Sequence, residues 1–132
     1  MGHLNPYLIK LIEEAIAEEE LAFAAYMKMT DAFGENADKI RAIAADEMKH
    51  KKMLADLYED LTGKMPEKTK AETVDFESKN KAEMVAESLE KEIENAKMYR
   101  TMYFAMADQR GKNVLFEIMT DEMLHGAALA AM

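Results

Sequence analysis

The sequence of 132 residues contains no cysteine and no tryptophan, and only two prolines and five glycines. Without cysteine the chain cannot form disulfides, thiolate zinc sites or iron–sulfur clusters, and it has no cysteine nucleophile. A metal would have to be bound by carboxylates and imidazoles, which suit hard or borderline ions. Long stretches of Ala, Glu, Lys, Leu and Met lie between the few glycines and prolines, and they favour helix.

Two further absences limit the partners. No apolar run approaches the ~20 residues of a membrane span, and the N-terminus lacks the apolar core of a secretory signal, so we expect a soluble, cytoplasmic protein. The net charge is −9 and no stretch concentrates Lys or Arg, which argues against nucleic acid and membrane partners. The length fits a single domain over residues 1–132.

Capping and helix-breaking residues predict two helices in the first half of the chain. Asn5 and Pro6 are a typical N-cap and first helical residue, and this helix should stop near Gly34. A second helix should begin after Asn36 and end at Gly63, which is a typical C-terminal cap.

Two more helices are predicted in the second half. A helix should restart at Asn80, with Glu83 in the position of a capping box, and run to about Gln109. Gly111 and Asn113 should separate it from a last helix that nearly reaches the C-terminus. A polar connection over about residues 63–79 joins the two helical hairpins. This pattern predicts an all-α fold, the ferritin-like four-helix bundle of two hairpins joined by a long crossover.

Two of the three histidines occur in nearly identical pentapeptides, DEMKH (46–50) and DEMLH (121–125). The same 75-residue offset separates Glu47 from Glu122 and His50 from His125. In each pentapeptide the Glu and His are three residues apart, so they share a helix face, and apolar residues continue that face in both directions. Both pairs should therefore be buried, which is costly unless the groups are paired or bind a metal.

The other two helices should supply partner carboxylates. Glu19 is the acid on the apolar seam of the first helix, and we choose Glu92 on the third, with Glu94 as the alternative. Tyr26 and Tyr99 support this choice because each lies seven residues after its glutamate. The 75-residue offset would instead pair Glu19 with Glu94, so choosing Glu92 requires a turn two residues longer between the third and fourth helices.

One glutamate from each of two helices and Glu-x-x-His from each of the other two form a di-iron or di-manganese carboxylate site. Four carboxylates balance the charge of two divalent ions, and positions remain open for dioxygen or peroxide. Iron and manganese both accept this ligand set, a mixed pair is possible, and zinc could occupy it as prepared. The predicted ligands are Glu19, Glu47, His50, Glu92, Glu122 and His125.

Several segments resemble the rubrerythrin-like branch of the ferritin superfamily, namely EELAFAAY, DEMKHKKMLADLYEDLTG, EIENAKMY and LFEIMTDEMLH. The resemblance covers nearly the whole chain. It implies a di-iron bundle, often a homodimer, that reduces peroxide or oxidises ferrous iron. It also implies that the six residues above are metal ligands, with Tyr26 and Tyr99 beside the site. From the residues alone these tyrosines are also explained as core aromatics with hydrogen-bonded hydroxyls.

The chain departs from the rubrerythrin pattern in two ways. Rubrerythrins proper carry a cysteine-ligated rubredoxin domain, so an electron donor here would be a separate, rubredoxin-like protein. They also carry a further glutamate three residues beyond the third-helix ligand, where this chain has Asn95, and the fourth-helix pair here ends in His125. In these respects the site is more similar to the symmetric bacterioferritin type.

The function expected from these residues is that of a non-haem di-iron oxidoreductase, which reduces peroxide or dioxygen while it oxidises ferrous iron. Two alternatives remain open at this point. The chain could be a ferroxidase that feeds iron storage in a larger oligomer, or a metal-binding bundle without catalysis.

Overall fold

A computed structural model describes residues 5–68, 76 and 79–132 of the chain. Within these ranges the chain forms four α-helices and two short 3₁₀ helices, and no strand. The α-helices are α1 (Pro6–Met29), α2 (Ala37–Thr62), α3 (Lys81–Ala105) and α4 (Gln109–Ala130), and the 3₁₀ helices η1 (Thr30–Ala32) and η2 (Gly34–Asn36) connect α1 to α2. The predicted all-α fold is confirmed.

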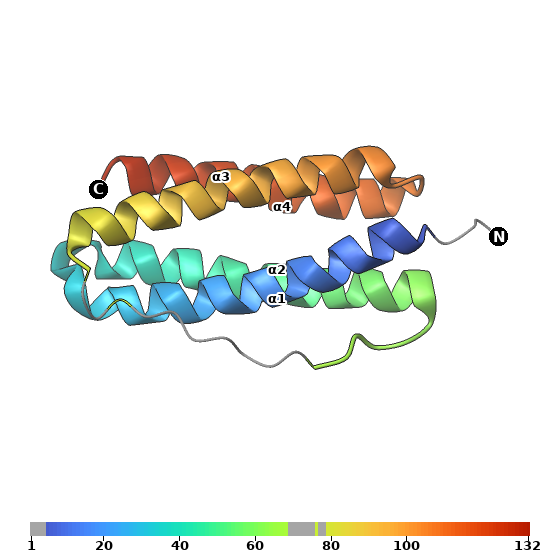
Figure 1. Cartoon of the computed structure of the whole chain (residues 1–132), viewed down its shortest axis with the longest axis horizontal. Coiled ribbons are helices and arrows are strands. Elements are labelled where there is room, and N and C mark those ends of the chain that lie inside the picture. Colours follow the sequence, from blue (N-terminus) through green and yellow to red (C-terminus); the bar gives the residue numbers. More distant parts are fainter. Residues whose placement is uncertain (1–4, 69–75, 77–78) are drawn as a thin grey trace.

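The helices form two antiparallel hairpins that lie side by side (Figure 1). The α1 helix packs mainly on α2, and α3 packs mainly on α4. Because α3 begins at the end of the bundle where α2 also begins, these two helices run in the same direction (Figure 1). This order is that of the ferritin-like four-helix bundle. Most of the crossover expected at about 63–79 lies outside the described residues.

Three of the predicted helix boundaries are confirmed in atomic detail. The Asn5 side chain accepts a hydrogen bond from the Tyr7 amide at 3.0 Å, and Gly63 ends α2 with a left-handed φ of 76°. At α3, Asn80 Oδ1 accepts from the Glu83 amide at 2.9 Å, and Glu83 Oε1 accepts from the Asn80 amide at 3.2 Å. This reciprocal pair is a capping box, which satisfies two amides that would otherwise lack a partner.

The connection between α3 and α4 differs from the prediction. The third helix ends at Ala105 rather than near Gln109, and Gly111 lies inside the first turn of α4. Asp108 begins α4 because its carboxylate accepts a hydrogen bond from the Gly111 amide at 3.0 Å. Gly111 instead lets Met106 pack closely on α4, since a Cβ there would lie 2.6 Å from the Met106 sulfur and the methionine side chain would have to shift.

The expected longer turn is therefore also wrong. Residues 106–108 connect α3 to α4, whereas residues 30–36 connect α1 to α2. The second hairpin gains its extra length in both helices. The α3 helix extends farther beyond Glu92 than α1 extends beyond Glu19, and α4 begins farther before Glu122 than α2 begins before Glu47. The periodicity of the apolar residues could not distinguish a longer turn from longer helices.

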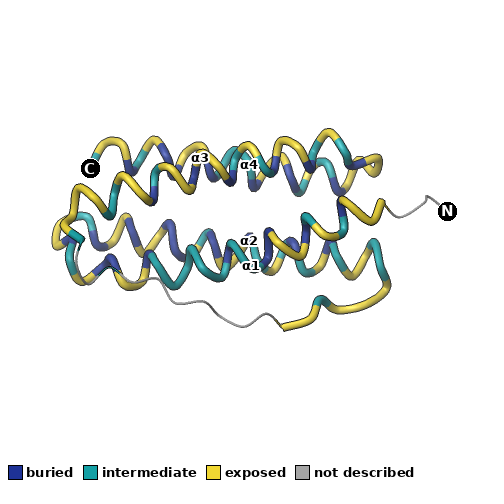
Figure 2. Tube along the Cα trace, in the orientation of Figure 1, coloured by how far each residue is buried: buried dark blue, intermediate teal, exposed yellow. Residues whose placement is uncertain are grey.

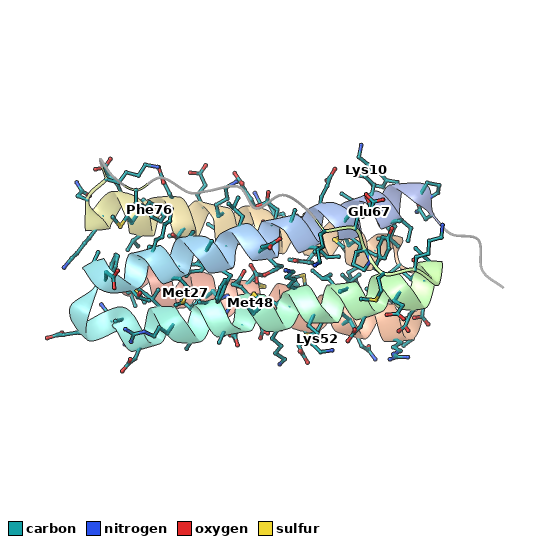
Figure 3. The ribbon with its side chains drawn as sticks, turned by 90° about the horizontal axis from the view of Figure 1, so that it is seen from below. Lys10, Met27, Met48, Lys52, Glu67 and Phe76 are labelled. Atoms are coloured by element: carbon teal, nitrogen blue, oxygen red, sulfur yellow. The ribbon has the colours of Figure 1, made fainter. Side chains whose placement is uncertain are left out.

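Buried residues lie along the sides of the helices that face the other hairpin (Figure 2), while Lys10 and Lys52 point away from the bundle (Figure 3). The buried apolar residues form two clusters, one around Ile12, Leu54 and Leu115 and the other around Met29, Ile40 and Leu129. Along each helix, the predicted ligands come between the residues of one cluster and those of the other. None of the helices described is long and apolar enough to cross a membrane.

The capping box gives a prediction about stability. Replacing Asn80 with Ala removes the side-chain acceptor at the start of α3 and should lower the free energy of unfolding by about 1 kcal/mol. Asn36 is the matched control, because it precedes α2 without a side-chain cap hydrogen bond. Urea unfolding of the metal-free protein measures both, and equal losses in Asn80→Ala and Asn36→Ala would contradict the assignment.

Candidate metal centre

Six ionisable side chains meet at the middle of the bundle, and all are buried. Glu19, Glu47, His50 and Glu122 are 0% exposed, Glu92 is 2% exposed and His125 is 5% exposed. The α1 and α3 helices contribute one glutamate each, whereas α2 and α4 contribute a Glu-x-x-His pair each. Charged groups in such a position require compensation, because burial removes them from water.

The six residues form two groups that could each hold a metal ion. One contains Glu19, Glu47, His50 and Glu122, and the other contains Glu47, Glu92, Glu122 and His125. In each group one ligand atom from every residue lies within 4.8 Å of the others. Glu47 and Glu122 belong to both groups, so they are positioned to be shared between two ions.

The histidine rings are oriented by aspartates of the opposite hairpin. The Nε2 atom of His50 lies 2.7 Å from Asp121 Oδ2, and the Nε2 atom of His125 lies 2.8 Å from Asp46 Oδ2. Because an ionised carboxylate only accepts hydrogen bonds, each Nε2 must carry the proton. The Nδ1 atom of each ring then faces the cluster, where a neutral imidazole could offer its lone pair to a metal.

The two tyrosines make an equivalent crossed pair of contacts. Tyr26 on α1 donates its hydroxyl proton to Glu92 on α3, and Tyr99 on α3 donates to Glu19 on α1, both at 2.5 Å. Each hydrogen bond occupies one oxygen of a glutamate that belongs to only one group. The other oxygen of each remains free to bind a metal.

The buried atoms that lack a hydrogen-bond partner provide a test of whether metal ions fit. Among the residues described, such side-chain atoms occur only on the six cluster residues: both oxygens of Glu47 and Glu122, one oxygen each of Glu19 and Glu92, and the Nδ1 atoms of both histidines. Some of these atoms lie close to one another, since His50 Nδ1 is 3.0 Å from Glu122 Oε1 and His125 Nδ1 is 2.9 Å from Glu47 Oε1. The remaining carboxylate oxygens would be costly to leave without a partner in a protein interior. Two divalent ions would bind these oxygen and nitrogen atoms and balance the charge of the four carboxylates, so the six residues fit a pair of metals.

Without metals, protons must reduce the repulsion between the carboxylates. Burial raises the pKa of Glu47, and the adjacent carboxylate of Glu19 raises it further. Burial raises the pKa of Glu122 to about 8. Burial acts to lower the pKa of both histidines, but the surrounding carboxylates raise it to about 11 for His50 and about 9 for His125.

Glu92 and the tyrosines behave differently from the shared glutamates. Burial acts to raise the pKa of Glu92, but its proximity to His125 lowers it overall. Burial and the neighbouring carboxylates raise the pKa of Tyr26 and Tyr99, so both phenols keep their protons and remain donors.

The structure brings together all six residues chosen from the sequence and the two tyrosines. Glu94, the alternative to Glu92, is exposed and lies 3.8 Å from Lys91. Asp46 and Asp121 were not identified from the sequence as partners of the histidines. Their shared position, four residues before each histidine, was visible in the repeated pentapeptides but did not indicate a contact across the hairpins.

The sequence model of the Rubrerythrin family matches residues 10–132. The chain belongs to the rubrerythrin family. No match is found among curated protein sequences. Among solved structures, this rubrerythrin-family chain is similar to the bacterioferritin of Desulfovibrio desulfuricans, whose X-ray structure describes a diiron site in different catalytic states. The TM-score is 0.77 at 17% identity, over 95% of this chain and 77% of the bacterioferritin chain, and this likeness shows the fold.

The crossed histidine contacts of this rubrerythrin-family protein give a prediction about metal affinity. In Asp121→Asn or Asp46→Asn the ring loses its charged acceptor, so affinity for one metal should fall by about 10- to 100-fold. Calorimetric titration with Co²⁺ measures this loss. Asp56→Asn is a suitable control because, among the residues that the structure describes, Asp56 pairs with the exposed Lys52 at 3.2 Å and not with the cluster. Equal affinities in all three variants would show that the aspartates do not support the site.

The raised pKa values also predict how stability depends on pH in the metal-free protein. The pKa of Glu122 rises from 4.5 to about 8 on folding, and that of His125 rises from 6.5 to about 9. The folded state then binds more protons than the unfolded state within these windows, so stability should fall as pH rises from about 5 to 9. The lowered pKa of Glu92 acts in the opposite sense but at pH values below 4.5.

Thermal unfolding in the presence of a chelator measures this dependence. The melting temperature should fall steadily as pH rises, and the fall should be smaller in Glu122→Gln, which lacks one of the groups responsible. A melting temperature that increases between pH 5 and pH 9 would contradict the assigned direction.

Proposed function

We propose that this protein is a di-iron carboxylate oxidoreductase of the rubrerythrin and ferritin-like type. The observation that carries the proposal is the set of buried ligand atoms without a hydrogen-bond partner, which in the described part of the chain all lie on the six residues at the centre of the bundle. The two overlapping groups support a pair of metals rather than a single ion. Membership of the rubrerythrin family favours iron over the other divalent ions that the same donors accept.

Each residue of the cluster has a role in this proposal. His50 and Glu19 would hold one ion, and His125 and Glu92 the other, with Glu47 and Glu122 shared between them. A bound iron pair would supply the electrons that reduce peroxide or dioxygen, as ferrous iron is oxidised. The apolar clusters on both sides exclude bulk water, and this strengthens the electrostatic interactions of the buried carboxylates with the ions.

The phenols would keep the outer carboxylate oxygens in place while the charge of the site changes. Tyr26 and Tyr99 donate to Glu92 and Glu19, and burial keeps both hydroxyls protonated. They therefore hold protons within the cluster without adding negative charge. The electrons that restore the ferrous state would come from a separate donor, because the chain has no cysteine with which to ligate a rubredoxin-type iron.

Anaerobic titration with ferrous iron followed by hydrogen peroxide or air tests the proposal. We expect about two ions per chain, followed by near-ultraviolet absorption from ferric carboxylate and consumption of the oxidant. Faster turnover with peroxide than with dioxygen would indicate a peroxidase, and the reverse a ferroxidase. Iron binding without any oxidation would exclude both activities.

Variants of the shared and flanking glutamates locate the site. Glu47→Ala and Glu122→Ala should each lose at least one of the two ions, because each carboxylate belongs to both groups. Glu92→Ala and Glu94→Ala form a matched pair on α3, of which only Glu92→Ala should lose iron, since Glu94 is exposed. Two ions retained in Glu47→Ala would place the metals elsewhere.

A further inference from the structure

The buried cluster must receive its cations through the protein surface, and two pockets approach it. One is a pocket of ≈310 Å³ between α1 and α3, whose lining includes Tyr26 and Asn95. The other is a groove of ≈420 Å³ between α3 and α4, whose lining includes Glu92 and Glu122. The charges at the mouths of the two pockets differ, so the pockets should differ in whether they admit cations.

The α1–α3 pocket has an acidic mouth. Its lining contains four glutamates and one lysine: Glu18, Glu87, Glu90, Glu94 and Lys91. Lys79 pairs with Glu87 at 2.7 Å, and Lys91 approaches Glu94 at 3.8 Å. Glu18 and Glu90 make no ion pair with any residue that the structure describes. Even after these lysines are counted, the mouth keeps a net negative charge that attracts cations.

The α3–α4 groove has the opposite character. The charged residues at its rim are Lys97 and Arg100, and apolar residues such as Ile93 and Met123 form most of its remaining walls. A hydrated divalent cation would lose water along these apolar walls before it reached a ligand, and the two basic groups would repel it. Although two cluster glutamates lie at its base, this groove is therefore the less favourable path for a cation.

Asn95 provides the second observation at the α1–α3 pocket. Its side chain is only 6% exposed and lines the pocket, yet it makes no hydrogen bond with any described residue. Its polar atoms are not among the fully enclosed atoms that lack a partner, so the carboxamide opens on the pocket, where water or a ligand can be its partner. Asn95 lies one turn after Glu92 on the same face of α3, and beside Tyr26, whose hydroxyl contacts Glu92.

We propose that divalent cations enter through the α1–α3 pocket, attracted by its acidic mouth and passed to the cluster by the Asn95 carbonyl oxygen. The mouth glutamates are not among the groups close enough to hold an ion, so a cation there keeps most of its water and moves on. Phe76 borders the pocket beside the N-terminal half of α3 (Figure 3). This inference rests on the proposed function, since it assumes that the centre takes up divalent cations.

The experiment measures loading of the metal-free full chain with Co²⁺ by stopped-flow absorbance. The pocket variant combines Glu18→Gln, Glu90→Gln and Glu94→Gln. The control combines Glu14→Gln, Glu35→Gln and Glu59→Gln, which change the net charge equally at exposed positions outside the pocket. The pocket variant should load about tenfold more slowly than the control and depend less on salt, with unchanged stoichiometry.

A second variant tests the inner step without changing charge. Asn95→Leu removes the carbonyl oxygen and keeps a side chain of similar size, so loading should slow while about two ions still bind at equilibrium. Equal loading rates in the pocket variant and its control would overturn the route while leaving the proposed function intact. A wild-type chain that binds no Co²⁺ or Fe²⁺ would overturn both.

Discussion

Repulsion among four buried glutamates is the constraint on which the rest of this structure depends. Glu19, Glu47, Glu92 and Glu122 are nearly inaccessible to water, and the two buried histidines among them offset only part of the charge. A core of apolar residues would be more stable at the same position, because burying ionised groups costs more than their mutual contacts return. The arrangement is therefore explained by what it can bind rather than by what it contributes to folding.

The same cluster also joins the two halves of the bundle. Within each hairpin the helices pack extensively, whereas α1 and α3, and α2 and α4, contact each other much less. The short polar contacts of the cluster all cross between hairpins: Tyr26 with Glu92, Tyr99 with Glu19, His50 with Asp121 and His125 with Asp46. Binding of metal would thus stabilise the docking of one hairpin on the other, which couples site and fold.

Periodicity explains why most of the fold and the cluster could be predicted from the sequence. A polar residue on an apolar helical face must be buried, so Glu19, Glu47 and Glu122 could be placed without a structure. Contacts between hairpins could not be placed in this way. Asp46 precedes Glu47 by one residue and belongs to a different face of α2, and only the approach of α4 brings it to His125. The turn after α3 was misjudged because a glycine was taken as a breaker where it serves close packing against Met106.

Among the four glutamates, the two with a raised pKa are the two that a pair of metals would share. Glu47 and Glu122 each face carboxylates from both groups, and burial together with this repulsion raises the pKa of both side chains. Glu92 does not hold a proton in this way, because its proximity to His125 lowers its pKa. Cations at the shared positions would replace protons there, since both relieve the same repulsion. Metal uptake therefore requires proton release, and the pH at which the site loads depends on the two shared glutamates and on the two histidines, whose pKa is also raised.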